Sequence, residues 1–226
     1  MKLEKIMKGY FKYFSQASLR LLFLIAIVLY SCGEDEDAQP RDEEIIDALL
    51  TDSIQGIIEG FDIVLNKGTN PPNLENTFSI RPLVLIGSNI EEDEIGSRFN
   101  NQTLQITEQN NEDLTVKIFR QDGATAESKG FGGFIIGEDD MFTLMIEETS
   151  VNYWTNDSLR SVMIYSGQLG EEGIKDIRIL LTATEDWGDP NNVFIEIGQS
   201  RLFEDGDQLS PVVEIDLAHA RKDDTY

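Results

Sequence analysis

The feature that most constrains this fold is a series of short segments in which side chains repeat with a period of two. In residues 114–118 apolar side chains alternate with threonine and lysine, and residues 142–146 follow the same period. Such a period places successive side chains on opposite faces of a β-strand. The candidate strands are 76–86, 102–108, 113–121, 125–137, 141–149, 160–168, 174–184 and 192–203.

The connections between these segments are short and rich in turn residues. Asp122-Gly123 is a strong hairpin signal, and residues 138–140, 170–173 and 189–192 carry weaker ones. Successive short turns favour an antiparallel meander over residues 74–211, which we expect to close into a barrel of about eight strands that resembles the lipocalins. A β-sandwich is the alternative. The glycine-rich stretch 130–137 predicts a bend or bulge in one strand.

Residues 42–68 precede the strands and predict one amphipathic helix. Their apolar side chains recur at spacings of three and four, which forms a single stripe. Acidic residues at 42–44 suit the positive end of a helix dipole. Gly68 and the prolines at 71 and 72 end the pattern.

The start of the chain predicts an export signal over residues 1–31. Four lysines and one arginine precede the apolar run 21–30, which is too short to span a bilayer as a helix. Leu29, Ser31 and Cys32 then resemble the lipobox of bacterial lipoproteins, and Cys32 is the only cysteine in the chain. The resemblance implies cleavage before Cys32 and acylation of its thiol, which would anchor the protein in a membrane.

An acidic tether, residues 32–41, follows the cysteine. Glu34, Asp35, Glu36 and Asp37 resemble the surface-export signal of Bacteroidota lipoproteins. This resemblance implies a lipid-anchored outer-membrane protein exposed on the cell surface. A solvated spacer is the other interpretation of the run, because like charges extend a linker. The layout of the whole chain resembles poorly characterised Bacteroidota surface lipoproteins, and it implies no activity.

The charge balance argues against several classes of partner. The chain has 42 acidic and 18 basic side chains, a formal net charge of −24. A surface this acidic repels phosphate backbones, so we expect no nucleic-acid partner. It also repels anionic lipid head groups, whereas cations, cationic peptides and neutral glycans are compatible with it as partners.

Catalytic motifs are absent from the sequence, so we expect a protein without enzymatic activity. The only histidine, His219, lies in the C-terminal tail, residues 212–226, and no Gly-x-Ser-x-Gly context accompanies it. Glu147 and Glu148 are the least implausible carboxylate pair for a glycan hydrolase.

Calcium is the one cofactor that the acidic loops would suit, because it prefers six to eight oxygen ligands. The candidate ligands are Asp186 with Asp189, and Asp205 with Asp207. Neither pair has the spacing of a twelve-residue calcium loop, and solvated turns are the alternative.

Three aromatic residues, Tyr153, Trp154 and Trp187, stand among loop residues that carry amide and carboxylate groups. Exposed rings beside amides suit sugar stacking or protein contact, although each ring could instead cap the core. The sequence therefore predicts a surface-anchored binding domain whose ligand is a glycan, a lipid or a protein. The alternatives are an accessory subunit of an outer-membrane complex and a carboxylate-dependent hydrolase.

Overall fold

The computed structural model describes residues 52–61, 63–124 and 126–215. The predicted export signal, Cys32, the acidic run behind it and His219 lie outside these residues. No helix in the described ranges combines the length and apolarity needed to cross a membrane.

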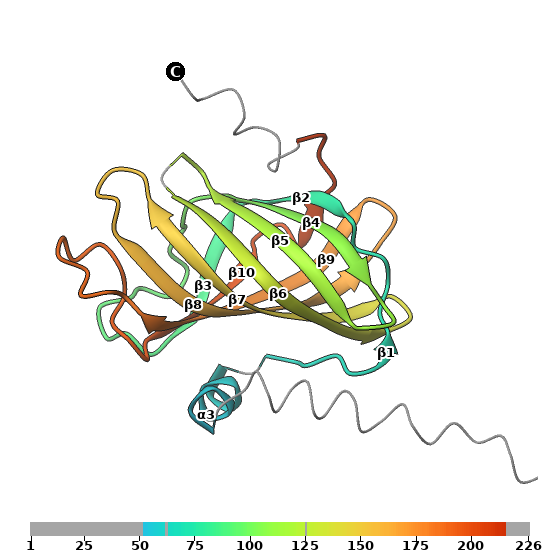
Figure 1. Ribbon diagram of the computed structural model, residues 1–226, viewed down its shortest axis with the longest axis horizontal. Helices are drawn as coiled ribbons and strands as arrows, with labels where there is room; N and C mark the ends of the chain where they lie inside the picture. Colours follow the sequence, from blue (N-terminus) through green and yellow to red (C-terminus); the bar gives the residue numbers. More distant parts are fainter. Residues whose placement is uncertain (1–51, 62, 125, 216–226) are drawn as a thin grey trace, which may run out of the picture. The chain divides into compact units, whose positions relative to one another are not determined.

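The described residues form one antiparallel sheet that curves into a nearly closed barrel, as the sequence predicted (Figure 1). Nine strands follow the order β2-β4-β5-β6-β7-β8-β9-β10-β3, and the two short strands β1 and β11 pair with β6 and β9. The elements are α3 (Asp52–Phe61), β1 (Thr69–Asn70), β2 (Asn76–Ile80), β3 (Leu83–Ser88), β4 (Gln102–Asn110), β5 (Thr115–Asp122), β6 (Ala126–Glu138), β7 (Met141–Asn152), β8 (Ser158–Leu169), β9 (Gly173–Glu185), β10 (Ser200–Asp205) and β11 (Leu209–Pro211).

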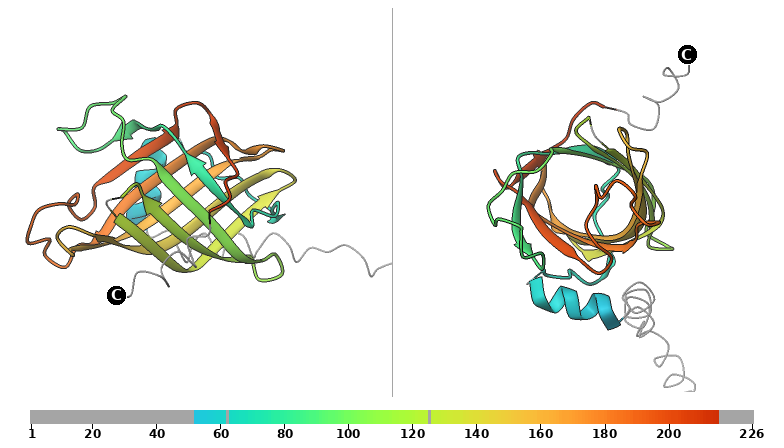
Figure 2. Two further views of the ribbon diagram at one scale, coloured as in Figure 1. Left: turned by 90° about the horizontal axis from the view of Figure 1, so that it is seen from above. Right: turned by 90° about the vertical axis from the view of Figure 1, so that its left-hand side faces the viewer.

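The barrel closes through a strand that bends. Because every neighbouring pair on the nine-strand path is antiparallel, β2 and β3 run in the same direction, and they are halves of one course that turns at Arg81–Pro82. The first half pairs with β4 and the second half pairs with β10. The predicted strand 76–86 is thus divided, and each half seals a different part of the ring, which Figure 2 shows from one end.

Backbone hydrogen bonds join both halves of this bent course to the neighbouring chain, and we call this line of closure the seam. On one side the amides of Leu85 and Phe99 donate to Ser97 and Leu83 over 2.9 Å each, which joins β3 to the chain entering β4. On the other side the Val213 amide donates to the Thr77 carbonyl over 2.8 Å. The predicted tail therefore begins as part of the barrel wall.

A bulge in β6 sets which of its side chains face inward. Five residues of β6, Gly130 to Phe134, lie opposite four residues of β7, Met145 to Glu148, and the pairing with β5 shifts at the same place. An extra residue reverses the alternation of faces. Ser128 and Ile135 consequently both face the interior although seven positions separate them. The bulge confirms what the glycine-rich stretch predicted.

Large apolar side chains fill the middle of the barrel. Phe78, Phe142 and Tyr165 are fully buried there, and each of the nine strands of the path contributes at least one apolar or aromatic side chain to the same cluster. Close packing of this kind leaves a filled interior instead of a through-channel.

The N-terminal segment packs on the outside of the wall. Ile58 and Ile63 contact a second apolar cluster that includes Met145, Ile164 and Leu180 on the outer face of β7 to β9. Residues 42–51 of the predicted helix lie outside the described ranges, and the helix ends at Phe61, earlier than the predicted boundary at 68.

The reason for the early end is Asn66, which fixes the following chain to the sheet. Its backbone amide donates to Thr143 Oγ1 over 2.6 Å, and its side-chain amide donates to the Phe142 carbonyl over 3.0 Å. These bonds replace the intrahelical ones that a longer helix would need.

One predicted strand, 192–203, is mostly wrong. Residues 192–199 form a loop, and regular pairing begins only at Ser200. The Asp189 carboxylate accepts hydrogen bonds from the amides of Val193 and Phe194 over 3.0 and 2.8 Å. This local turn uses the donors that a longer β10 would have offered to β9.

Candidate functional site

The interior of the barrel changes from apolar to charged along its length. In β5 the inward side chains run Val116, Ile118, Arg120 and Asp122. In β7 the inward apolar side chains up to Ile146 are likewise followed by Glu148 and Ser150. The charged end is the one bounded by the β3–β4, β5–β6, β7–β8 and β9–β10 loops, which we call the mouth.

Arg120 is the centre of the charged interior. Its guanidinium Nε donates to Glu148 Oε1 over 3.1 Å, and its two terminal nitrogens form ion pairs with Glu148 and Asp122. It also donates to Ser128 Oγ over 2.7 Å and to Ser150 Oγ over 3.1 Å. Burial opposes the charge of Arg120, but the two carboxylates outweigh burial and raise its pKa above the usual value.

The ion pairs leave one negative charge in excess at this position. A single guanidinium faces the carboxylates of Asp122 and Glu148, and the side chains of Arg120 and Glu148 are essentially buried. Charges in such surroundings are poorly screened by water. The interior of the mouth therefore carries a fixed negative field.

Two polar atoms beside this cluster are buried without hydrogen bonds. Gln102 is 5% exposed, and its Oε1 meets no donor among the residues that the structure describes. The Tyr165 hydroxyl, on a fully buried side chain, likewise has no partner within the described part of the chain. Burial, with the charge of Glu148, raises the pKa of Tyr165 well above its usual value. Buried polar atoms without partners are uncommon and point to water or a ligand.

A pocket of about 380 Å³ opens above the cluster. Its polar lining consists of Asn100, Gln102, Arg120, Asp122, Ser150, Asn152 and Arg201. Its apolar walls come from distant parts of the chain: Leu83, Phe99, Leu159, Leu181, Val193, Phe194, Ile195 and Phe203. A mostly apolar hollow with a few convergent polar groups is the usual form of a small-molecule site, and this volume is at the small end of the range.

Arg201 and Asp93 form a second ion pair in the mouth. Two hydrogen bonds of 2.8 Å join the guanidinium to the carboxylate, and these bonds, against the effect of burial, lower the pKa of Asp93. The Arg201 guanidinium lies 5.1 Å above the ring of Phe99, which packs edge-on against Phe203. This pair is neutral overall, so it leaves the excess negative charge of the Arg120 cluster unchanged.

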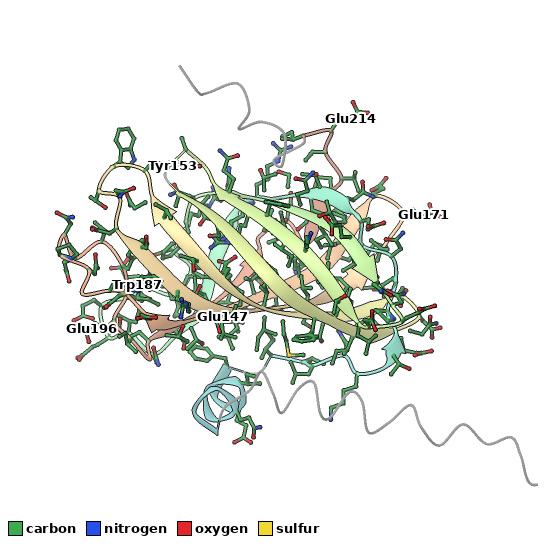
Figure 3. The ribbon with its side chains drawn as sticks, viewed as in Figure 1. Glu147, Tyr153, Glu171, Trp187, Glu196 and Glu214 are labelled. Carbon is green, nitrogen blue, oxygen red and sulfur yellow. The ribbon has the colours of Figure 1, made fainter. Side chains whose placement is uncertain are left out.

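The three aromatic residues predicted from the sequence lie at the same end of the barrel. Trp154 lines the pocket and is 79% exposed, and Tyr153 precedes it in the β7–β8 loop. Trp187 lies in the β9–β10 loop, half-exposed, under the guanidinium of Arg160 at 5.2 Å. Figure 3 places Tyr153 and Trp187 at one end of the barrel and Glu171 at the other. None of the three caps the core.

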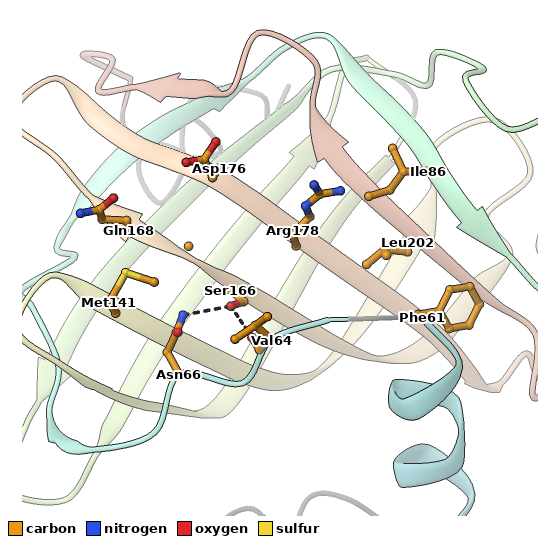
Figure 4. Close-up of a pocket in the computed structure, with 11 residues that line it drawn as sticks. Phe61, Val64, Asn66, Ile86, Met141, Ser166, Gln168, Asp176, Arg178 and Leu202 are labelled. Atoms are coloured by element: carbon orange, nitrogen blue, oxygen red, sulfur yellow. Dashed lines mark hydrogen bonds between the residues drawn. The ribbon is translucent and has the colours of Figure 1, made fainter.

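A second hollow, of about 570 Å³, lies on the outer wall among Phe61, Val64 and Asn66 and residues of β3 and β7 to β10 (Figure 4). Several of its polar groups are already hydrogen-bonded or ion-paired. Ser166 accepts from Asn66 and donates to the Val64 carbonyl, and Arg178 pairs with Glu204 over 2.9 Å. Although it is larger, this hollow contains no buried charge and no buried atom lacking a partner among those described, so the mouth is the stronger candidate.

The candidate calcium ligands are separated by the length of β10. Asp186 and Asp189 lie at the mouth and accept hydrogen bonds from backbone amides of their own loop. Asp205 is buried at the far end of β10, where it accepts from the Arg81 amide and the Ser210 hydroxyl. Within the described ranges no three side chains of the Asp, Glu, His or Cys types are grouped to hold a metal ion.

Glu147 and Glu148 lie on opposite faces of the barrel wall. Glu147 is exposed and pairs with Arg160 over 3.3 Å, whereas Glu148 is buried against Arg120. Successive residues of a strand point in opposite directions, so these two carboxylates cannot act on one substrate. The prediction that Glu147 and Glu148 form the carboxylate pair of a hydrolase is therefore wrong.

Arg120 and Gln102 were missed in the sequence, although a signal for them exists. Both occupy inward positions next to buried apolar side chains of the same strand, so each interrupts a buried stripe. A charged residue in such a register is a polar group that the fold must accommodate inside. Comparison with protein-family models, with curated proteins and with solved structures gave no match.

Proposed function

We propose that this protein is a non-enzymatic binding protein held on the cell surface by acyl chains on Cys32, and that its ligand is a small molecule bound in the mouth of the barrel. The observation that carries the proposal is the pocket itself. It combines apolar walls, a fixed buried ion pair and an unused acceptor on Gln102.

The filled interior favours a ligand that binds at the mouth and argues against a long lipid enclosed within the barrel. Phe78, Phe142 and Tyr165 occupy the centre of the barrel, so an acyl chain would have to displace them. Loops at the mouth vary in shape more easily than the strands beneath them, and this arrangement suits recognition on a rigid scaffold.

The charge cluster supports binding instead of hydrolysis. Asp122 and Glu148 are both ion-paired with Arg120, so a substrate would have to compete with the guanidinium for either carboxylate.

The anchor is tested by metabolic labelling with a clickable fatty acid. We expect label on the purified protein and in the membrane fraction, and loss of both in Cys32→Ala. Ser31→Ala keeps a small residue at the cleavage site and should retain the label. An unlabelled native protein, or a labelled Cys32→Ala variant, would overturn the anchor.

The binding site is tested with the full-length protein in phosphatidylcholine nanodiscs, with empty nanodiscs as the blank. A small-molecule screen by ligand-observed NMR should give hits that compete with one another. Ala126→Trp would fill the mouth, because Ala126 lines the pocket, and should abolish these hits. A screen without hits, or hits that persist in this variant, would remove the mouth as the binding site.

An accessory role in an outer-membrane complex is the second candidate, and exposed apolar side chains at the mouth favour it. Ile95, Trp154 and Ile197 are each more than half exposed there. A stoichiometric protein partner that co-purifies from intact membranes and is lost in Trp154→Ala would favour this role over small-molecule binding.

A further inference from the structure

We infer, on the basis of the proposed function, that the mouth selects ligands in which a protonated amine is attached to an apolar or aromatic body. The inference names the class of ligand, and it rests on charge, on the unused acceptor and on the walls of the pocket.

The first argument is the balance of charge inside the mouth. Two guanidinium groups, of Arg120 and Arg201, face three carboxylates, of Asp93, Asp122 and Glu148. One negative charge is left, and it lies where solvent screens weakly. An ammonium group would neutralise it, whereas a carboxylate or phosphate would add a second uncompensated charge.

The second argument is the acceptor of Gln102. Gln102 is one of the residues that line the pocket and is 5% exposed, and its Oε1 is buried without a donor among the described residues. An ammonium group offers three N–H donors and no acceptor. A ligand of this kind would satisfy the amide oxygen and face the carboxylates at the same time.

The third argument is the composition of the walls and the entrance. Phe99, Phe194 and Trp154 contribute aromatic surface to the pocket, and aromatic faces attract cations. The loops that frame the entrance, residues 89–101, 153–157 and 186–199, contain eight acidic residues and one basic residue. Such an entrance raises the local concentration of cations and repels anions.

The test compares three ligands with the same body and different heads: 2-phenylethylamine, 2-phenylethanol and 3-phenylpropanoate at pH 7. Affinities are measured by isothermal titration calorimetry on the full-length protein in phosphatidylcholine nanodiscs, with empty nanodiscs as the blank. We expect the amine to bind at least tenfold more tightly than the alcohol, and the carboxylate to bind most weakly.

The outcomes separate this inference from the proposed function. Equal or tighter binding of the alcohol or the carboxylate overturns the amine preference and leaves the mouth as a binding site. If none of the three binds while other compounds compete at the mouth, the class of ligand is wrong. If no compound of any charge binds, the proposed function fails with it.

Two variants tie the preference to the charge cluster. Asp122→Asn removes the excess negative charge, and Ala126→Lys adds a positive charge to the lining while leaving Arg120 and its partners in place. In each variant the ratio of amine to alcohol affinity should fall at least fivefold. Glu147→Gln, which removes a charge from the outer face, should leave the ratio unchanged. A ratio that stays constant in a folded Ala126→Lys variant overturns the inference.

Discussion

Arg120 on β5 and Glu148 on β7 form an ion pair across the strand that separates them. The guanidinium Nε and the carboxylate Oε1 are 3.1 Å apart, and β6 between them contributes Ser128, whose hydroxyl accepts from the same guanidinium. One side chain thus connects three neighbouring strands inside the barrel.

Removing Arg120 should destabilise the protein strongly. Arg120→Met would leave two carboxylates without their partner, one of them fully buried, and the loss of one partner of a buried ion pair costs about 3–5 kcal/mol. Urea denaturation followed by circular dichroism measures the change. The matched control is Arg178→Met on the outer wall, where the pair with Glu204 is partly exposed and should contribute about 1 kcal/mol or less. Equal losses in the two variants would contradict the structure of the cluster.

Tyr165→Phe should stabilise the protein by up to about 1 kcal/mol. The hydroxyl is buried without a partner among the described residues, and removing an unsatisfied polar group relieves its desolvation cost. Thr182→Val is the matched contrast, because the Thr182 hydroxyl bonds Ser200 Oγ over 2.9 Å and its loss should destabilise by about 1 kcal/mol. A destabilised Tyr165→Phe would mean that the hydroxyl has a bound partner in solution.

The stability contribution of Asp205 should fall as the pH rises from about 4 to about 6. Burial, against the hydrogen bond from Ser210, raises the pKa of Asp205 from 3.8 to about 6. The folded state therefore holds a proton that the unfolded state has released, and the favourable contribution present below pH 4 is lost as the pH passes 6. The difference in pKa corresponds to about 3 kcal/mol at most.

The comparison that isolates this effect is the free energy of unfolding of the wild type minus that of Asp205→Asn, measured across the pH range. The difference should slope downward between pH 4 and 6 and be flat above. The pKa of Asp93 is lowered, mainly by its hydrogen bond from Arg201, so its effect on the free energy of unfolding falls below pH 4 and outside this window. Parallel curves for the two proteins would refute the raised pKa.

Trp154→Ala should weaken binding of 2-phenylethylamine roughly twofold to fivefold, the range of an exposed cation–π contact. Because the side chain is 79% exposed, the free energy of unfolding should change by less than about 0.5 kcal/mol. Trp187→Ala is the control, since that ring lies under Arg160 and outside the pocket lining. Weaker binding in the control and not in Trp154→Ala would move the ligand to the β9–β10 loop.

Most of the fold could be predicted because the information for a meander is local. Alternation within each segment defines a strand, and Asp122-Gly123 defines a hairpin without reference to distant residues. The glycine-rich stretch of β6 likewise predicted its own bulge. Residues 192–199 were wrongly predicted as strand, because the Asp189 side chain accepts hydrogen bonds from this loop that compete with strand pairing.

The candidate site was harder to predict because it depends on which face of each strand is inside. Glu147 and Glu148 are equivalent in the sequence, and only the closed sheet makes one a surface residue and the other a partner of Arg120. The bulge in β6 adds a further reversal of faces before Ser128. The exposed aromatics were easier to find, because a loop position alone identified them.

The seam has a consequence for how the molecule comes into being. The ring is sealed by residues near the start of the barrel, 76–88, against residues near its end, 200–213. A nascent or truncated chain that stops before Ser200 therefore has two exposed sheet edges, whose unpaired amides and carbonyls can pair with another copy of the chain. Completion of the last strands therefore converts an open sheet, whose exposed edges favour aggregation, into a nearly closed barrel.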